Sequence, residues 1–170
     1  MKSSIFLLGL FLSIAVSGQT QKGITLYGYV QSGTKGIAGK ESDKKGVKKS
    51  PSKIYTYHMY LASNSRNRIY PAEIWIKGER LGVKYETVSQ TPVTISKDDA
   101  LPNSGQIVLV PKTTALVLHL TGSRDMPEKK FDRAKDIAAN NELVVVYKSG
   151  GNYHYAALKK FSELGGGVLQ

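Results

Sequence analysis

Short runs of apolar, β-branched and aromatic residues, separated by turn residues, follow one another along most of the chain. The clearest run is KIYTYHMYLA at 53–62, which alternates between two sets of positions. A period of two is typical of a β-strand, and it places Tyr55, Tyr57, Met59 and Leu61 on one face. The dominant signal is therefore that of a β protein.

The same pattern predicts further strands at 24–30, 91–95, 106–110 and 115–122. Residues 72–88 predict a hairpin that turns near Lys77-Gly78-Glu79, with Trp75 on one face and Ile74 and Ile76 on the other. The turn residues at 149–152 predict a final hairpin between 142–148 and 153–161. The segment Pro111 to Thr114 predicts another hairpin, between 106–110 and 115–122.

One segment, DMPEKKFDRAKDIAANN at 125–141, has the pattern of a helix instead. Asp125 and Glu128 have the spacing of a capping box. Phe131, Ala134 and Ala138 recur at i, i+3 and i+7, which forms a narrow apolar stripe. We therefore predict one short helix near 125–140, packed on the edge of a sheet.

Seven to nine short strands with hairpin turns and one helix are typical of the all-β class. The predicted architecture is an antiparallel β-sandwich of the immunoglobulin-like or transthyretin-like kind, and a small closed β-barrel is the alternative. Residues 19–164 are expected to form a single domain. The tail at 165–170 contains three consecutive glycines and is expected to be flexible.

The segment LYGYVQSGTKGIAG at 26–39 resembles the opening of carboxypeptidase-regulatory-like, or transthyretin-like, modules. In that family a strand ending in G-x-V precedes a turn and a G-x-P-L-x-G-like segment. Residues 28–30 and 36–39 match this order, although the usual proline is absent. The resemblance covers less than a tenth of the chain. It implies a β-sandwich with an accessory role and no catalytic residues.

The first residues have the three parts of a secretory signal peptide. Lys2 supplies the positive charge, residues 5–16 form an apolar run, and small residues lie at Ala15, Ser17 and Gly18. A transmembrane anchor is the alternative, but this run is much shorter than the roughly 20 residues that cross a bilayer. We expect residues 1–18 to be removed and the protein to be exported to the periplasm, the cell surface or the medium.

Composition narrows the possible partners. The chain has no cysteine, which excludes disulfides, zinc–thiolate sites and thiol nucleophiles and favours a bacterial exported protein. It has 24 lysines and arginines against 13 acidic residues, a formal net charge of +11. Such a charge favours a polyanionic partner. Given export, we expect an acidic protein, an anionic glycan or a lipid surface, and no sequence-specific nucleic acid.

Lysines are concentrated in KESDKKGVKKSPSK at 40–53, within a predicted flexible basic loop at 35–53. The lysines considered for loose electrostatic binding are Lys44, Lys45, Lys48 and Lys49. No arginine or aromatic residue accompanies them, so the bidentate and stacking contacts of specific nucleic-acid recognition are not expected. The alternative is a solvated loop without a binding role.

Catalytic and metal-binding motifs are weak. His58, His119 and His154 each lie in a predicted strand, but no ligand spacing such as H-E-x-x-H joins them. S-x-x-K spacings occur only in the lysine-rich region, and no nucleophile elbow is present. Several glutamates share the 72–88 hairpin, but an acid pair of the glycosidase kind needs a set separation and a cleft. We expect no catalytic residue, metal or cofactor.

Tyrosine is the most informative residue type, with ten tyrosines against one tryptophan. Tyrosine suits a partly hydrated sheet face and can stack on sugar rings or contact a protein. The predicted binding residues are Tyr55, Tyr57, Trp75 and Tyr85. The favoured function is a non-catalytic binding or structural component of a bacterial envelope or secreted assembly. The alternative is an envelope hydrolase acting on glycan or peptide, with a site assembled from scattered histidines and acidic residues.

Overall fold

The computed structural model describes residues 18–19, 23–34, 53–65, 68–96 and 105–164, and it confirms the predicted all-β class with one short helix. The elements in chain order are β1 (Gly18–Gln19), β2 (Ile24–Thr34), β3 (Lys53–Ser63), β4 (Ile69–Ile76), β5 (Glu79–Thr87), β6 (Val93–Ser96), β7 (Gln106–Val110), β8 (Leu116–Ser123), α1 (Asp132–Ala138), β9 (Leu143–Ser149), β10 (Asn152–Leu158) and β11 (Ser162–Leu164).

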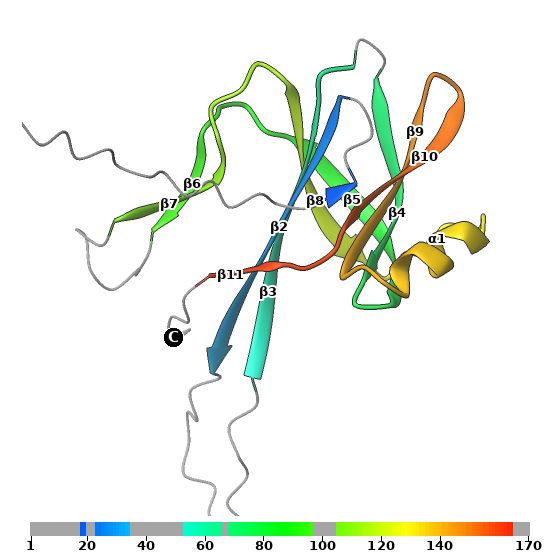
Figure 1. Ribbon diagram of the computed structural model, residues 1–170, viewed down its shortest axis with the longest axis horizontal. Helices are drawn as coiled ribbons and strands as arrows, with labels where there is room; N and C mark the ends of the chain where they lie inside the picture. Colours follow the sequence, from blue (N-terminus) through cyan, green and yellow to red (C-terminus); the bar gives the residue numbers. More distant parts are fainter. Residues whose placement is uncertain (1–17, 20–22, 35–52, 66–67, 97–104, 165–170) are drawn as a thin grey trace, which may run out of the picture.

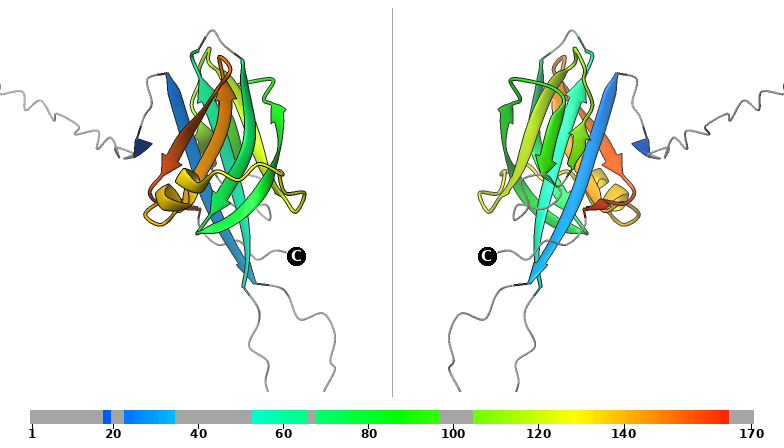
Figure 2. Two further views of the ribbon diagram at one scale, coloured as in Figure 1. Left: turned by 90° about the vertical axis from the view of Figure 1, so that its right-hand side faces the viewer. Right: turned by 90° about the vertical axis from the view of Figure 1, so that its left-hand side faces the viewer.

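Nine strands form one curled sheet in the order β1-β10-β9-β4-β5-β8-β3-β2-β11 (Figure 1). Neighbouring strands are antiparallel except β11, which runs parallel to β2. Strand β5 joins the two halves, because residues 79–81 pair with β4 and residues 82–87 pair with β8. The curl brings β10 against β2, so the sheet combines features of the predicted sandwich and of the barrel alternative (Figure 2).

The main core fills the space inside this curl. Alternation in β3 sends Met59 and Leu61 into it, as the sequence pattern predicted, and β8 contributes Leu118 and Leu120. Strand β9 has five consecutive buried residues, 143–147, rather than an alternating pattern. A continuous apolar run is expected where both faces of a strand are covered.

Two separate elements cover the outer faces of the sheet, on opposite sides of it in Figure 1. Helix α1 covers one half, where Phe131 and Ala134 pack against Val146. The ribbon formed by β6 and β7 covers the other half, where Leu109 packs in a cluster with Val117. The sheet is therefore a middle layer with apolar contacts on both sides.

Tight turns connect two of the hairpins. Lys77 and Gly78 have φ angles of 49° and 83°, and Gly150 and Gly151 have φ angles of 58° and 87°. Two consecutive residues with positive φ suit the two-residue turns that match the twist of antiparallel strands. The predicted hairpins over 72–88 and 142–161 are both confirmed.

The hairpin predicted between 106–110 and 115–122 is wrong, because β7 pairs with β6 and β8 lies between β3 and β5. The turn-like residues at 111–114 are instead held by Thr91. Its hydroxyl donates to the Thr113 carbonyl oxygen and accepts from the Thr113 N–H, each at 3.0 Å. These hydrogen bonds attach the connection between β7 and β8 to the segment that precedes β6.

The predicted capping box is also wrong, because α1 begins at Asp132 and has no side-chain cap. Asp125 instead accepts a hydrogen bond from the Ser123 hydroxyl at 3.0 Å and lies 3.4 Å from the Lys84 ammonium. The apolar stripe itself is confirmed, with Phe131, Ala134 and Ala138 buried. Among the described residues, no helix is long and apolar enough to cross a membrane.

Candidate functional site

A groove of about 600 Å³ opens at the end of the curled sheet where β3 begins and the β4–β5 hairpin turns. This volume lies within the range of small-molecule binding sites. The lining residues are Tyr55, Thr56, Tyr57, Met59, Ile76, Lys77, Glu79, Leu81, Thr121 and Gly122. The groove is thus the open mouth of the main core, lined by side chains from four strands.

The floor of the groove is apolar and its rim is aromatic and polar. Met59 and Ile76 belong to the buried core, whereas Tyr55 is exposed. Tyr57 is half-buried and its ring is held by Phe161, with centroids 5.0 Å apart and ring planes at 51°. One tyrosine is therefore fixed by packing, and the other is available to a ligand.

Lys77 is the most constrained residue of the rim. It is the only residue other than glycine, among those the structure describes, with a positive φ angle. Its N–H donates to the Glu142 carbonyl oxygen at 2.7 Å, and its ammonium lies 5.8 Å from the centre of the Tyr55 ring. A left-handed lysine carries a conformational cost, and here the two-residue turn of the β4–β5 hairpin requires that conformation.

The groove offers a limited chemistry. Two tyrosines and two threonines supply hydroxyl groups, Lys77 supplies an ammonium and Glu79 a carboxylate. Aromatic bodies with hydroxyl donors and acceptors suit a hydroxyl-rich ring compound. The charges of Lys77 and Glu79 offset each other, so the groove does not by itself select a polyanion.

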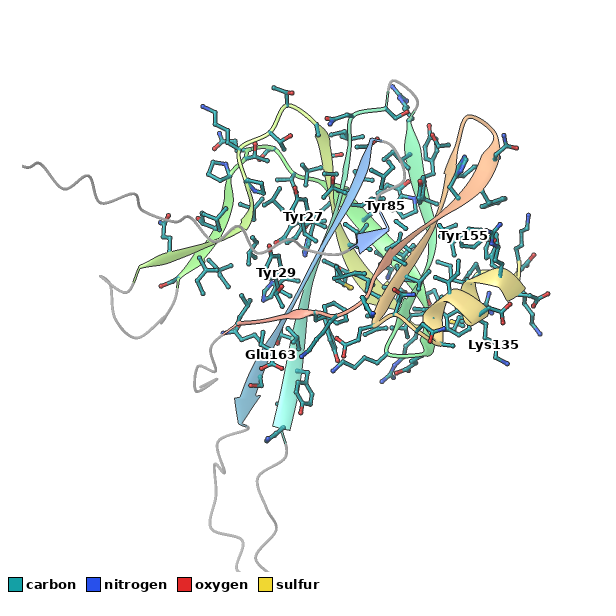
Figure 3. All side chains as sticks on the ribbon, in the orientation of Figure 1. Tyr27, Tyr29, Tyr85, Lys135, Tyr155 and Glu163 are labelled. Atoms are coloured by element: carbon teal, nitrogen blue, oxygen red, sulfur yellow. The ribbon has the colours of Figure 1, made fainter. Side chains whose placement is uncertain are left out.

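The structure brings together only part of the predicted binding set. Tyr55 and Tyr57 line the groove, as an alternating strand requires. Trp75 lies on the outer face instead, half-buried beside α1, and its indole N–H donates to Glu73 at 2.6 Å. Tyr85 is exposed on β5 but does not line the groove, and Figure 3 shows it in the upper part of the view, whereas β3 begins at the bottom.

The predicted basic residues Lys44, Lys45, Lys48 and Lys49 lie outside the described residues. The sequence interpretation missed Lys77, Glu79 and Thr121 as groove residues. The Lys77-Gly78 turn was recognisable in the sequence, but its closeness to Tyr55 depends on how β4 and β3 face each other across the curl.

Two of the three histidines come close together on the outer face of the other half. Register places Tyr27, Tyr60, His119 and Glu86 in one row across β2, β3, β8 and β5. His119 stacks on Tyr60 at 5.0 Å and its Nδ1 lies 3.0 Å from Glu86. Burial, together with the neighbouring His119, lowers the pKa of His58 below its usual value.

His154 lies apart on β10, where it stacks on Tyr147 with ring centroids 5.6 Å apart. Within the described ranges, no group of three or more histidine or acidic side chains is arranged to hold a metal ion. The three histidines therefore do not converge on one site.

No family model matches the chain, no curated protein matches its sequence, and no solved structure matches its fold. The comparisons therefore add no support to the resemblance noted at residues 26–39.

Proposed function

We propose that the protein is an exported, non-catalytic binding component of a bacterial envelope or secreted assembly, and that its groove holds a sugar unit of a glycan. The observation that carries this proposal is the pairing of Tyr55 and Tyr57 with Lys77 at the mouth of the core. Sugar rings present apolar C–H faces and hydroxyl edges, which match tyrosine rings beside polar groups.

Export is supported by the pattern of the first 18 residues, and for an exported chain the absence of cysteine favours a bacterial source. The large positive charge supports an anionic partner, since it attracts the protein to negatively charged surfaces. In this proposal long-range attraction brings the protein to its partner, and the groove makes the selective contact.

The hydrolase alternative receives less support. Glycoside hydrolysis ordinarily requires two carboxyl groups flanking the bond. Glu79 is the one carboxylate among the residues that line the groove. His58 and His119 lie on the outer face, on the opposite side of β3 and β8 from the core residues Met59 and Leu120.

The test is a titration of the isotopically labelled full mature chain with neutral disaccharides, namely cellobiose, chitobiose and maltose, followed by amide chemical shifts. We expect shifts at Thr56, Tyr57, Gly78 and Gly122 for at least one of them. Tyr55→Ala should weaken that binding about fivefold, because aromatic stacking contributes about 1 kcal/mol.

The matched control is Tyr85→Ala, which removes an exposed tyrosine of similar accessibility away from the groove. It should leave the dissociation constant unchanged within about twofold, because Tyr85 does not line the groove and ordinary surface substitutions have small effects. Absence of shifts at these four amides with all three sugars at millimolar concentration would overturn the proposal, as would equal losses from the two tyrosine variants.

A further inference from the structure

A second surface with distinctive chemistry lies on the outer face of β4, β9 and β10, beside α1. Tyr70 pairs with Lys148, and Lys148 pairs with Tyr153, so these three side chains form one row across the three strands. Tyr70 and Tyr153 are among the exposed large side chains, and Lys148 is exposed too. Neighbouring strands are separated by about 4.8 Å, so the row is about 10 Å long.

Lys129 extends this row towards the helix. Its ammonium lies 4.1 Å from the centre of the Tyr153 ring and 5.4 Å from that of Phe131. The Tyr153 ring is in turn held by Phe131, with centroids 4.8 Å apart and planes at 56°. Phe131 is buried, so the ring that carries the ammonium is anchored in the core beneath α1. We call Tyr70, Lys148, Tyr153 and Lys129 the tyrosine–lysine face.

The backbone that carries Lys129 is fixed by a buried ion pair. Glu73 is fully buried, and its Oε2 accepts from Nε of Arg80 at 2.7 Å. Nη2 of Arg80 donates to the carbonyl oxygens of Lys129, at 2.8 Å, and Pro127, at 3.2 Å. Lys129 is therefore held at both ends, by Arg80 through its backbone and by aromatic rings at its ammonium.

A similar contact lies next to this face. The Arg133 guanidinium carbon is 5.6 Å from the centre of the Tyr155 ring, and Figure 3 shows Tyr155 beside α1. In both contacts the cation covers a ring, so the surface presents ordered positive charges with tyrosine beneath them. A cation held in place before binding loses less conformational entropy when it meets an anion.

We propose that the tyrosine–lysine face binds a chain of acidic polysaccharide, with Lys129 and Lys148 contacting its anionic groups and Tyr70 contacting a sugar ring. The charges of the two lysines are complementary to such a chain, and the spacing of the row suits an extended polymer. This site is separate from the groove, so the proposal does not depend on what the groove binds.

A single-stranded nucleic acid fits this face less well. Nucleic-acid platforms stack bases on free aromatic faces. Here the Lys129 ammonium lies over the Tyr153 ring and the Arg133 guanidinium lies over the Tyr155 ring. A ligand therefore meets the cations and not the ring faces. The surface therefore favours carboxylate or sulfate groups on a sugar chain over stacked bases.

The experiment measures binding of polygalacturonate, a carboxylated polysaccharide, to the full mature chain by calorimetry at low salt. We expect binding that weakens as salt is raised, because exposed charges are screened. Lys129→Ala should weaken it about fivefold to tenfold, because the variant removes a charge-assisted contact. Tyr70→Ala should produce a similar loss.

The matched control is Lys130→Ala, which removes the same charge from the adjacent exposed residue. It should change the affinity by less than about twofold, because a distributed surface charge contributes little. Three outcomes would overturn the proposal, namely no binding at low salt, equal losses for Lys129→Ala and Lys130→Ala, or tighter binding of single-stranded DNA than of polygalacturonate. The groove variant Tyr55→Ala should bind polygalacturonate normally, so failure of one proposal is distinguishable from failure of the other.

Discussion

The two halves of the curled sheet are covered by elements that attach in different ways. On the half formed by β4, β9 and β10, the segment leading to α1 is held by the charged pair of Glu73 and Arg80, with the carboxylate fully buried. On the half formed by β2, β3 and β8, the β6–β7 ribbon is held by a neutral hydrogen bond from the Tyr29 hydroxyl to the Leu109 carbonyl oxygen, at 2.6 Å.

The charged attachment is the more demanding of the two. A buried carboxylate without partners is strongly destabilising, so Glu73 requires both Arg80 and the indole N–H of Trp75. Arg80 continues the network to two backbone carbonyl groups before α1. The helix side is therefore specified by one set of interdependent contacts.

The ribbon side is built instead from an apolar cluster with partly buried tyrosines around it. Tyr27 and Tyr29 point from β2 towards the ribbon (Figure 3), and burial raises the pKa of both hydroxyls. The contact of Tyr29 with the ribbon is a neutral hydrogen bond, and losing it costs less than leaving one partner of a buried charged pair alone. We therefore expect α1 to detach from the sheet in one cooperative step. The β6–β7 ribbon should instead detach gradually as single contacts are removed.

The largest expected effect is on the charged attachment. Glu73→Gln keeps the size of the side chain but removes the charge that Arg80 requires, so we expect a loss of about 3 kcal/mol in the free energy of unfolding. Urea denaturation followed by circular dichroism measures this loss. Hydrogen exchange should also become faster at α1 and at the amides of residues 128 and 129.

The matched control is Glu86→Gln, because Glu86 also contacts an ionisable side chain, that of His119, but is exposed. The free energy of unfolding should decrease by less than about 1 kcal/mol in this variant, as for other surface pairs. Replacing both partners, in Glu73→Leu/Arg80→Leu, should recover part of the stability if the single variant fails through an unpaired charge. Equal losses from Glu73→Gln and Glu86→Gln would contradict the proposed difference between the two covers.

Part of this architecture was predictable from sequence. Alternation identified β3, the β4–β5 hairpin and the final hairpin, because strand period and turn chemistry are local properties. The start of α1 was not predictable in this way. Asp125 and Glu128 have the spacing of a cap, but the helix begins only at Asp132. Arg80, which is 47 residues before Pro127 and 49 before Lys129, binds the carbonyl groups of both.

A smaller effect is expected on the ribbon side. Tyr29→Phe removes the hydroxyl that donates to Leu109 and leaves the ring in place, so the expected loss is about 1 kcal/mol. Amide exchange at 106–110 should become faster while exchange at α1 stays unchanged. Tyr27→Phe on the same face of β2 is the control and should have a smaller effect on the ribbon. Loss of protection at α1 in Tyr29→Phe would show that the two covers are coupled.

The candidate site was predictable only in its aromatic component. Tyr55 and Tyr57 follow from a period of two, but Trp75, which the same reasoning assigned to binding, serves the buried network of Glu73. A tryptophan on a strand face has the same sequence signature whether a ligand or a helix covers it. Which of these applies is decided by the long-range placement of α1, and local pattern carries no information about that.

The smallest expected effect is the pH dependence of the ribbon side, and it depends on His58. Its Nε2 is buried and, within the described part of the chain, has no hydrogen-bond partner. Burial first, and the proximity of His119 second, lower its pKa in the folded state below the usual value of 6.5. The unfolded chain therefore binds more protons than the folded chain just below pH 6.5, and stability should fall as the pH decreases through that range.

This loss cannot exceed about 1.4 kcal/mol per pH unit for one group. Urea midpoints measured between pH 8 and pH 5 should decline in the native chain, and His58→Gln should reduce the decline. His119→Gln should reduce it by less, because it removes only the second cause, and Glu86 would lose its histidine partner. His154→Gln, on the other half of the sheet, should leave the decline in place. A decline that persists unchanged in His58→Gln would assign the acid sensitivity to another group and would remove the difference in pH response between the two covers.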